Sequence, residues 1–279
     1  MAVFIEKFTK LDLNVLVCLF VYSGLPLNPL FAEDTKPWAA DLSAGVSSSL
    51  YRFNQESRTV DFEVLAEPSY KIQENLVLGL NGGITQSRDA DHLHRTFLND
   101  GRLFLTHSGP RLSQVFKLSE AISFAIPISE KSYKIDSLIT GVTLGPNLKA
   151  DFSSIGLKNF FTTYRLRGTK NFHRYTVSTE GNSNKEYNLS NRIDLEYSPI
   201  NKLGLRGTFI YGNGWSYAGN ATGNFSLEQA ISYEINNRMG LEIGHSNGGD
   251  ALSANGQDSN IAFINENASQ IYGALSYRL

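Results

Sequence analysis

The last eleven residues of the chain, SQIYGALSYRL (269–279), alternate between two kinds of side chain. One side of this stretch is apolar apart from a glycine and carries Ile271, Gly273, Leu275, Tyr277 and Leu279. The other side is more polar and carries Tyr272, Ala274, Ser276 and Arg278. A period of two is the pattern of an extended strand whose two faces meet different surroundings. The fold therefore depends on what the apolar face of this strand contacts.

The same alternation returns along the chain from residue 33 onward. Val60 and Phe62, for example, alternate with Asp61 and Glu63. An amphipathic helix would instead place apolar residues three and four positions apart. Pro110 interrupts the fourth alternating segment, so its two halves could also be separate strands. The pattern predicts twelve strands, at 39–53, 59–72, 76–85, 101–116, 121–129, 137–151, 159–167, 187–197, 203–211, 225–235, 239–245 and 269–279.

The connections between these segments alternate in length. Those after the second, eighth and tenth segments are short, with the sequences QEN, SPINK and NNR. The intervening connections are mostly long and polar, at about 86–100, 130–136, 168–186, 212–224 and 246–268, and only the first, about 54–58, is short. Short turns on one rim and long loops on the other are typical of an outer-membrane barrel. We therefore predict an all-β, antiparallel, up-and-down transmembrane β-barrel of about twelve strands, with short periplasmic turns and long extracellular loops.

The composition agrees with an all-β chain and excludes one class of partner. The 279 residues include 24 Gly, 13 Tyr and 17 Phe, which suit strands and turns. The 25 Lys and Arg residues nearly balance the 27 Asp and Glu residues, for a formal net charge of -2. A nucleic-acid-binding protein would need a basic surplus or stripe, so nucleic acid is not an expected partner.

The first 32 residues have the layout of a secretory signal peptide. Lys7 and Lys10 precede an apolar stretch at about 15–22, and Ala32 supplies a small residue at a cleavage site. The stretch is too short for a helical span, which needs roughly 20 apolar residues, and a short membrane anchor is the alternative. The only cysteine, Cys18, falls in this segment. We expect residues 1–32 to be removed and residues 33–279 to form one exported barrel domain without disulfides.

The carboxyl-terminal segment resembles the terminal signature of bacterial outer-membrane β-barrel proteins, including small porin-like barrels. That signature has a hydrophobic final residue, usually Phe, and hydrophobic residues at alternate positions before it. Ile271, Leu275, Tyr277 and Leu279 fit, whereas Gly273 and the final Leu are departures. The resemblance implies a location in the outer membrane of a Gram-negative bacterium. It also implies contact with outer-membrane lipids and lipopolysaccharide, and recognition of this strand by the barrel-assembly machinery.

If the apolar positions face lipid, the alternate positions face the interior of the barrel. Many of these positions are charged. The acidic ones are Asp61, Glu63, Glu67, Asp194, Glu196, Glu228, Glu234 and Glu242, and the basic ones are Lys71, Arg165, Arg167, Arg192, Arg206 and Arg278. They either pair across strands and fill a narrow barrel, or they line a water-filled path and set its ion preference.

Aromatic residues near the predicted strand ends indicate two girdles at the headgroup levels. Trp38, Tyr70, Tyr197 and Tyr277 lie near the short-turn rim. Tyr51, Tyr211, Trp215 and Tyr217 lie near the long-loop rim. Such girdles are typical of barrels that cross a bilayer.

Candidate sites for catalysis and metal binding are weak. Outer-membrane lipid hydrolases carry His, one residue, then Ser-Asn on a lipid-facing strand, whereas here Ser246 follows His245 directly. The two side chains would point to opposite faces of a regular strand, so no catalytic residue is predicted. Two polar loops carry scattered possible ligands, Asp89, Asp91, His92 and His94 in one and Asp250 and Asp258 in the other. Their spacing is too loose to predict a metal or a cofactor.

The favoured function is a porin-like channel for ions or small polar solutes, whose selectivity depends on the interior charges. A non-conducting barrel that binds a partner through its loops is the first alternative. A lipid hydrolase that uses His245 is the second and the weaker one.

Overall fold

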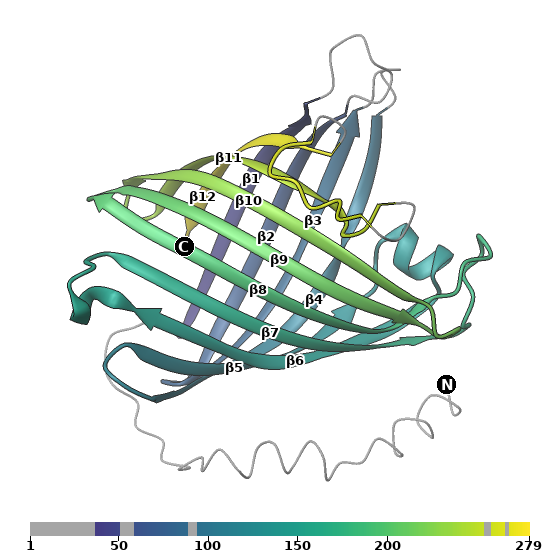
Figure 1. The fold of residues 1–279 in the computed structure, drawn as a ribbon, viewed down its shortest axis with the longest axis horizontal. Coiled ribbons are helices and arrows are strands. Elements are labelled where there is room, and N and C mark those ends of the chain that lie inside the picture. Colours follow the sequence, from purple (N-terminus) through teal and green to yellow (C-terminus); the bar gives the residue numbers. More distant parts are fainter. Residues whose placement is uncertain (1–36, 51–58, 89–93, 254–257, 266–267) are drawn as a thin grey trace. The chain divides into compact units, whose positions relative to one another are not determined.

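The protein is a closed barrel of twelve antiparallel strands (Figure 1). The structure, a computed structural model, describes residues 37–50, 59–88, 94–253, 258–265 and 268–279, so the predicted signal peptide lies outside the described residues. The strands are β1 (Trp38–Ser49), β2 (Val60–Gln73), β3 (Leu76–Arg88), β4 (His94–Arg111), β5 (Phe116–Ile126), β6 (Leu138–Asp151), β7 (Phe160–His173), β8 (Lys185–Ile200), β9 (Leu203–Ser216), β10 (Ala221–Asn236), β11 (Met239–Asp250) and β12 (Gln270–Arg278). The predicted fold class and strand number are confirmed.

The first and last strands close the barrel. β1 pairs with β12 from Asp41 opposite Arg278 to Ser49 opposite Gln270, and β1 pairs with β2 on its other side. The carboxyl-terminal strand is therefore not an edge, and its backbone groups are paired on both sides. Full closure removes the exposed edges that would otherwise template aggregation.

Contacts between non-adjacent strands identify the inner face of the wall. Asn99 on β4 donates to Glu63 on β2 at 2.8 Å, and Tyr272 on β12 donates to Glu228 on β10 at 2.6 Å. Side chains of strands that are not neighbours converge only on the concave side of a curved sheet. The residues that alternate with these polar groups consequently face outward.

The outward residues form a continuous apolar belt. Directly opposed outer-face pairs include Val46 with Phe62, Ile231 with Ile243, and Leu241 with Leu275. Most of the belt is exposed, and few described hydrophobic residues are buried, namely Ala150, Phe225, Ala230 and Ala251. A barrel whose apolar side chains face away from its interior is built for a hydrocarbon environment.

Aromatic residues sit on the outer face near the short-turn rim. Trp38 lies opposite Tyr70, Tyr277 lies opposite Met239, and the rings of Phe160 and Tyr197 are 6.5 Å apart. On the long-loop side, Trp215 lies opposite Tyr187 and shares its face. Tyr51 lies outside the described residues.

Several strands are longer than the hydrophobic pattern predicted. Most of the predicted loop 212–224 is strand, because β9 runs to Ser216 and β10 starts at Ala221, and β7 runs to His173 into the predicted loop 168–186. Likewise β3 extends to Arg88, and β4 starts at His94. The backbone ladder continues in these stretches, but apolar residues no longer alternate regularly with polar ones; Phe97 and Leu98, for example, are consecutive.

The predicted boundaries of the fourth and fifth strands, 101–116 and 121–129, were wrong by several residues. β4 ends at Arg111 and β5 begins at Phe116, with a four-residue turn between them. The ladder between β4 and β5 shifts register between Ser108 and Arg111, which accommodates Pro110 without ending the strand. Proline lacks an N–H group, so it is tolerated at such an irregularity.

The helical segments are short and lie in connections. η1 (Lys131–Ile135) connects β5 to β6, and η2 (Phe152–Ile155) connects β6 to β7. The Asp100 carboxylate anchors the first connection, because it accepts hydrogen bonds from the backbone N–H groups of Ile128 at 3.0 Å and Ser129 at 2.8 Å. Within the described ranges, no helix has the length and hydrophobicity needed to cross a membrane.

Candidate functional site: the charged inner wall

The strand register places the predicted interior charges on the inner face of the wall. Glu67 lies opposite Asp41, Arg192 lies opposite Arg165, and Glu196 lies opposite Arg206. The rest of the set follows the same alternation: Asp61, Glu63, Lys71, Arg167, Asp194, Glu228, Glu234, Glu242 and Arg278. Some of these residues form ion pairs with one another, in two separate groups, and others form no ion pair with a described residue.

The first paired group surrounds Asp194 on β8. Its side chain is 1 % exposed and contacts Arg192 Nε at 2.8 Å and Arg165 at 3.3 Å. The Thr208 hydroxyl donates to the same carboxylate at 2.7 Å. A carboxylate removed from water is tolerated where cations and donors satisfy its oxygens. Two arginines and one aspartate leave this cluster with a surplus positive charge.

The second paired group surrounds Arg206 on β9. Its guanidinium contacts Glu228 at 2.6 Å and Glu242 at 2.7 Å. The hydroxyl of Tyr272 donates to Glu228 at 2.6 Å and also reaches Glu242 at 3.1 Å. This arrangement joins β9, β10, β11 and β12 across the inner wall, and its two carboxylates against one guanidinium leave a surplus negative charge.

Gly244 on β11 lets Tyr272 reach this cluster. A Cβ atom at Gly244 would lie 2.4 Å from Cζ of Tyr272, closer than any side-chain contact permits. The tyrosine ring therefore covers the backbone of Gly244 and extends its hydroxyl to the two glutamates. Gly79 on β3 has the same relation to the inner-face ring of Phe104, where a Cβ atom would lie 2.1 Å from Cζ.

Arg167 on β7 is held without a carboxylate. Its guanidinium donates to the carbonyl oxygens of Gly145 at 3.1 Å and Pro146 at 3.0 Å, and to the side chain of Asn147. None of the ion pairs in the described part of the chain includes it. Arg167 therefore presents an uncompensated positive charge on the inner wall.

The inner face of β2 presents the opposite charge. Glu63 accepts hydrogen bonds from Asn99 and Thr85, which are neutral, and no ion pair among the described residues involves Asp61, Glu63 or Glu67. In the closed strand order, β2 and β8 are six strands apart in either direction. An acidic wall on β2 thus faces the arginine-bearing wall of β7 and β8 across the barrel.

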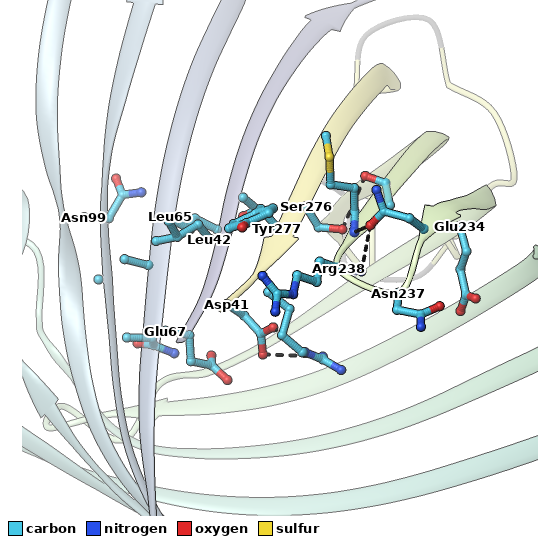
Figure 2. A pocket seen from close by; sticks show the side chains of 18 of the residues that line it. Asp41, Leu42, Leu65, Glu67, Asn99, Glu234, Asn237, Arg238, Ser276 and Tyr277 are labelled. Carbon is cyan, nitrogen blue, oxygen red and sulfur yellow. Dashed lines mark hydrogen bonds and ion pairs between the residues drawn. The ribbon is translucent and has the colours of Figure 1, made fainter. Parts of the chain in front are cut away.

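A cavity of about 550 Å³ lies along the inner surface near the barrel's closure (Figure 2). Arg278 contacts Asp41 there at 2.7 Å, and Glu67 lies on the adjacent strand. The end of β10 contributes Glu234 to the same cavity, and the turn between β10 and β11 contributes Asn237 and Arg238. Polar and charged side chains converge on this space from both sides of the β1–β12 pairing, as expected for a region that holds water.

His245 and Ser246 lie on opposite faces of β11. His245 lies opposite Ile271 on the outer face, whereas Ser246 lies opposite Gln270 and Glu228 on the inner face. The Nδ1 atom of His245 contacts the Gln229 side chain at 2.9 Å. A serine on the other side of the wall cannot exchange a proton with this imidazole.

The described residues contain no group of three His, Cys, Asp or Glu side chains that could hold a metal ion. The loop candidates Asp89, Asp91 and His92 lie outside the described residues, as does the side chain of His94. The metal hypothesis for the other loop, at Asp250 and Asp258, gains no third acidic or histidine ligand from the described residues.

The closed barrel is shared with known outer-membrane channels. An outer-membrane channel from Pseudomonas putida F1 matches with a TM-score of 0.61 and 8% identity, covering 91% of this chain and 100% of that chain. The NanC porin matches with a TM-score of 0.56 and 12% identity, covering 85% of this chain and 98% of that chain. No protein-family model and no curated protein sequence matches. At these identities the likeness establishes the transmembrane barrel fold.

Proposed function

We propose that the protein is a porin-like channel of a bacterial outer membrane that passes ions or small polar solutes. The observation that carries this proposal is the separation of uncompensated charge on the inner wall. Asp61, Glu63 and Glu67 face the side of the barrel that carries Arg167, and charged side chains form part of the lining of the cavity beside Glu67. A wall that only filled the barrel would be expected to pair these charges with one another.

The charge separation defines the class of solute. A small polar molecule with its own dipole, or a hydrated ion, gains favourable interactions on one side without burying charge in a dry interior. An apolar solute gains nothing from such walls. The structural likeness to channels at TM-scores above 0.5 supports the same reading, and it supports the outer membrane as the location.

Single-channel recording in planar bilayers tests this function. The folded protein should give discrete conductance steps in potassium chloride, and a salt gradient should yield a reversal potential that depends on the charged wall residues. Glu120→Gln is the matched control, because Glu120 is exposed and lies opposite His107 and Pro146 on the outer face. The absence of steps from correctly folded barrels would favour the non-conducting alternative.

The carboxyl-terminal strand is also proposed to be the segment that the assembly machinery recognises. Ile271, Gly273, Leu275 and Tyr277 share the outer-face register of β12, and Leu279 follows the end of this strand, where its N–H donates to the carbonyl of Ala40. Replacing Leu279 with Asp should lower the amount of folded barrel in cells. Folding of the purified chain into detergent should change little, which separates recognition from intrinsic stability.

A further inference from the structure

Three polar residues interrupt the apolar outer face at β10 and β11. Gln229 lies opposite His245, His245 lies opposite Ile271, and Asn247 is two positions further along β11 on the same face. About six residues separate His245 from Met239, which lies opposite the girdle residue Tyr277. At ~3.3 Å per residue and a tilt of ~45°, the histidine stands about 14 Å above that girdle. These polar groups therefore lie at the level of the hydrocarbon.

A segment of the β11–β12 loop covers this polar patch. We call residues 259–265 the strap. The carbonyl of Ala262 in the strap accepts a hydrogen bond from Nδ2 of Asn247 at 2.6 Å, and Asn247 is only 2 % exposed. The ring of Phe263 stacks on His245, with centroids 6.4 Å apart and an interplanar angle of 29°. The strap thus lies on the outside of the wall, because the residues it contacts face outward.

Hydrogen bonds fix both ends of the strap. The N–H of Asn260 donates to the carbonyl of Ala251 at 2.9 Å, and its side chain donates to the carbonyl of Asp250 at 3.1 Å. At the other end, the N–H of Asn265 donates to the hydroxyl of Ser269 at 3.0 Å. The strap is therefore held against the upper part of β11, beyond Ser246, where β12 no longer pairs with it.

The outward surface of the strap is apolar. Ile261, Phe263 and Ile264 are 41%, 61% and 62% exposed, and the sequence SNIAFIN of the strap contains no charged residue. Phe263 of the strap stacks on His245, whose neighbours on the outer face include the exposed residues Ile243 on β11 and Ile271 on β12. It thereby replaces a polar patch on the barrel wall by an apolar surface that continues the belt.

We propose that the strap is embedded in the membrane, with Phe263 and Ile264 among the acyl chains of the surrounding lipid. The occupant of this surface is lipid because the exposed residues continue the belt that lipid covers and because the strap carries no ionised side chain that would lose its hydration there. The Phe263 side chain stacks on His245 and is still 61% exposed, so it also presents an apolar surface away from the wall. This proposal rests on the membrane location given above.

Site-specific labelling tests the position of the strap. Cys18 is the only cysteine, so the full chain carrying Cys18→Ser accepts a single new cysteine at a chosen position. Phe263→Cys is compared with Ile243→Cys on the outer wall and with Glu180→Cys in the exposed β7–β8 connection. Each variant is labelled with an environment-sensitive fluorophore and folded into phosphatidylcholine vesicles. Quenching is measured with acyl-chain doxyl lipid and with iodide on both sides of the bilayer.

The expected result is that the Phe263 label is quenched by doxyl lipid to within about twofold of the Ile243 label and is protected from iodide. The Glu180 label should behave in the opposite way. If iodide quenches the label at position 263 while doxyl lipid quenches the label at position 243, the strap proposal is wrong, but the barrel is still in the membrane. Loss of doxyl quenching at Ile243 as well overturns the membrane location itself. Protection of Phe263 from both quenchers, with cross-linked dimers, assigns the surface to a second copy and also overturns the proposal.

Discussion

The inner faces of β2 and of β9–β12 carry similar residue types and use them differently. On β9–β12, the Arg206 guanidinium contacts Glu228 at 2.6 Å and Glu242 at 2.7 Å, and the Tyr272 hydroxyl reaches the same two carboxylates at 2.6 and 3.1 Å. On β2, Asp61, Glu63 and Glu67 face the interior, and none of them forms an ion pair with another residue that the structure describes. The first region ties four strands together, whereas the second leaves its charge available to a solute.

The difference arises from which residues lie across from each other. Arg206 on β9 lies between the strands that supply Glu196 on one side and Glu228 on the other, so cations and anions alternate around the wall there. Next to β2, the residues opposite Asp61, Glu63 and Glu67 are Ser47, Gly45 and Asp41 on β1, and Ser87 and Thr85 lie opposite the first two on β3. None of these neighbours is a cation, so none can neutralise a carboxylate. Under the proposed channel function, stability and conduction would therefore depend on different parts of the same wall.

The largest effect is expected from Arg206→Leu in the paired wall. The substitution leaves Glu228 and Glu242 close together without their cation. We expect the free energy of unfolding to fall by about 2 kcal/mol, below the roughly 3–5 kcal/mol for fully buried pairs, because these side chains are 24–33% exposed. Urea unfolding of the folded barrel in micelles, followed by fluorescence, measures the change.

The matched control is Glu228→Gln added to Arg206→Leu. Removing one of the two uncompensated carboxylates should restore about half of the lost stability. An Arg206→Leu barrel as stable as the parent, or a double variant weaker than the single one, contradicts the assignment of this cluster to stability.

The next effect is expected from Gly244→Ala beneath Tyr272. The new methyl group would lie 2.4 Å from the ring, so the tyrosine must move and lose its 2.6 Å hydrogen bond to Glu228. We expect a loss of about 1.5 kcal/mol in the free energy of unfolding, within the usual range for overpacking. Gly207→Ala is the control, because nothing lies within 4 Å of a Cβ atom there, and it should change stability by less than about 0.5 kcal/mol. In a Tyr272→Ala background, Gly244→Ala should also become nearly neutral.

The alternation of residues predicted the closed barrel because it reports which face each residue occupies. The pattern around Val60 to Val64 and in the final strand placed the correct residues on the outer face. It did not find where β9 ends or where β10 starts. Above the hydrocarbon both faces of these strands meet polar surroundings, so hydrophobicity no longer records the register that the backbone ladder keeps.

The contacts on the inner wall could not be predicted from the pattern alone. Alternation placed Asp194 and Glu67 on the same face of the wall. It did not show that Asp194 is buried against two arginines, whereas Glu67 contacts no arginine among the described residues. The prediction also left Asp41 out of the interior charges, although Asp41, Ser43 and Gly45 alternate with apolar residues in the sequence. It did not predict the contact of Tyr272 with Glu228, which the tyrosine makes across Gly244. Such contacts depend on side-chain reach between strands far apart in the sequence.

A smaller effect, on conduction rather than stability, is expected from the acidic wall. We expect the triple variant Asp61→Asn, Glu63→Gln and Glu67→Gln to keep its unfolding free energy within about 0.5 kcal/mol, because no ion pair is broken. In water, the interaction energy between a unit charge and an ion about 8 Å away is about 0.5 kcal/mol, which changes the occupancy of the ion at that position roughly twofold. The permeability ratio of potassium to chloride should therefore fall by at least twofold, as measured from the reversal potential. An unchanged ratio would remove this wall from the solute path.

The smallest effect is expected from Arg167→Gln on the opposite wall, and its sign is reversed. Removing this single uncompensated cation should raise the permeability ratio of potassium to chloride by about twofold, since one charge is lost instead of three. Arg167→Lys is the control, because it keeps the charge while losing the planar guanidinium, whose Nη1 donates to the carbonyls of Gly145 and Pro146 and whose Nη2 donates to Asn147. If the lysine variant shifts selectivity as much as the glutamine variant, the arginine acts by holding the β6–β7 wall in place. If only the glutamine variant shifts it, opposite charges on opposite walls both act on the passing ion.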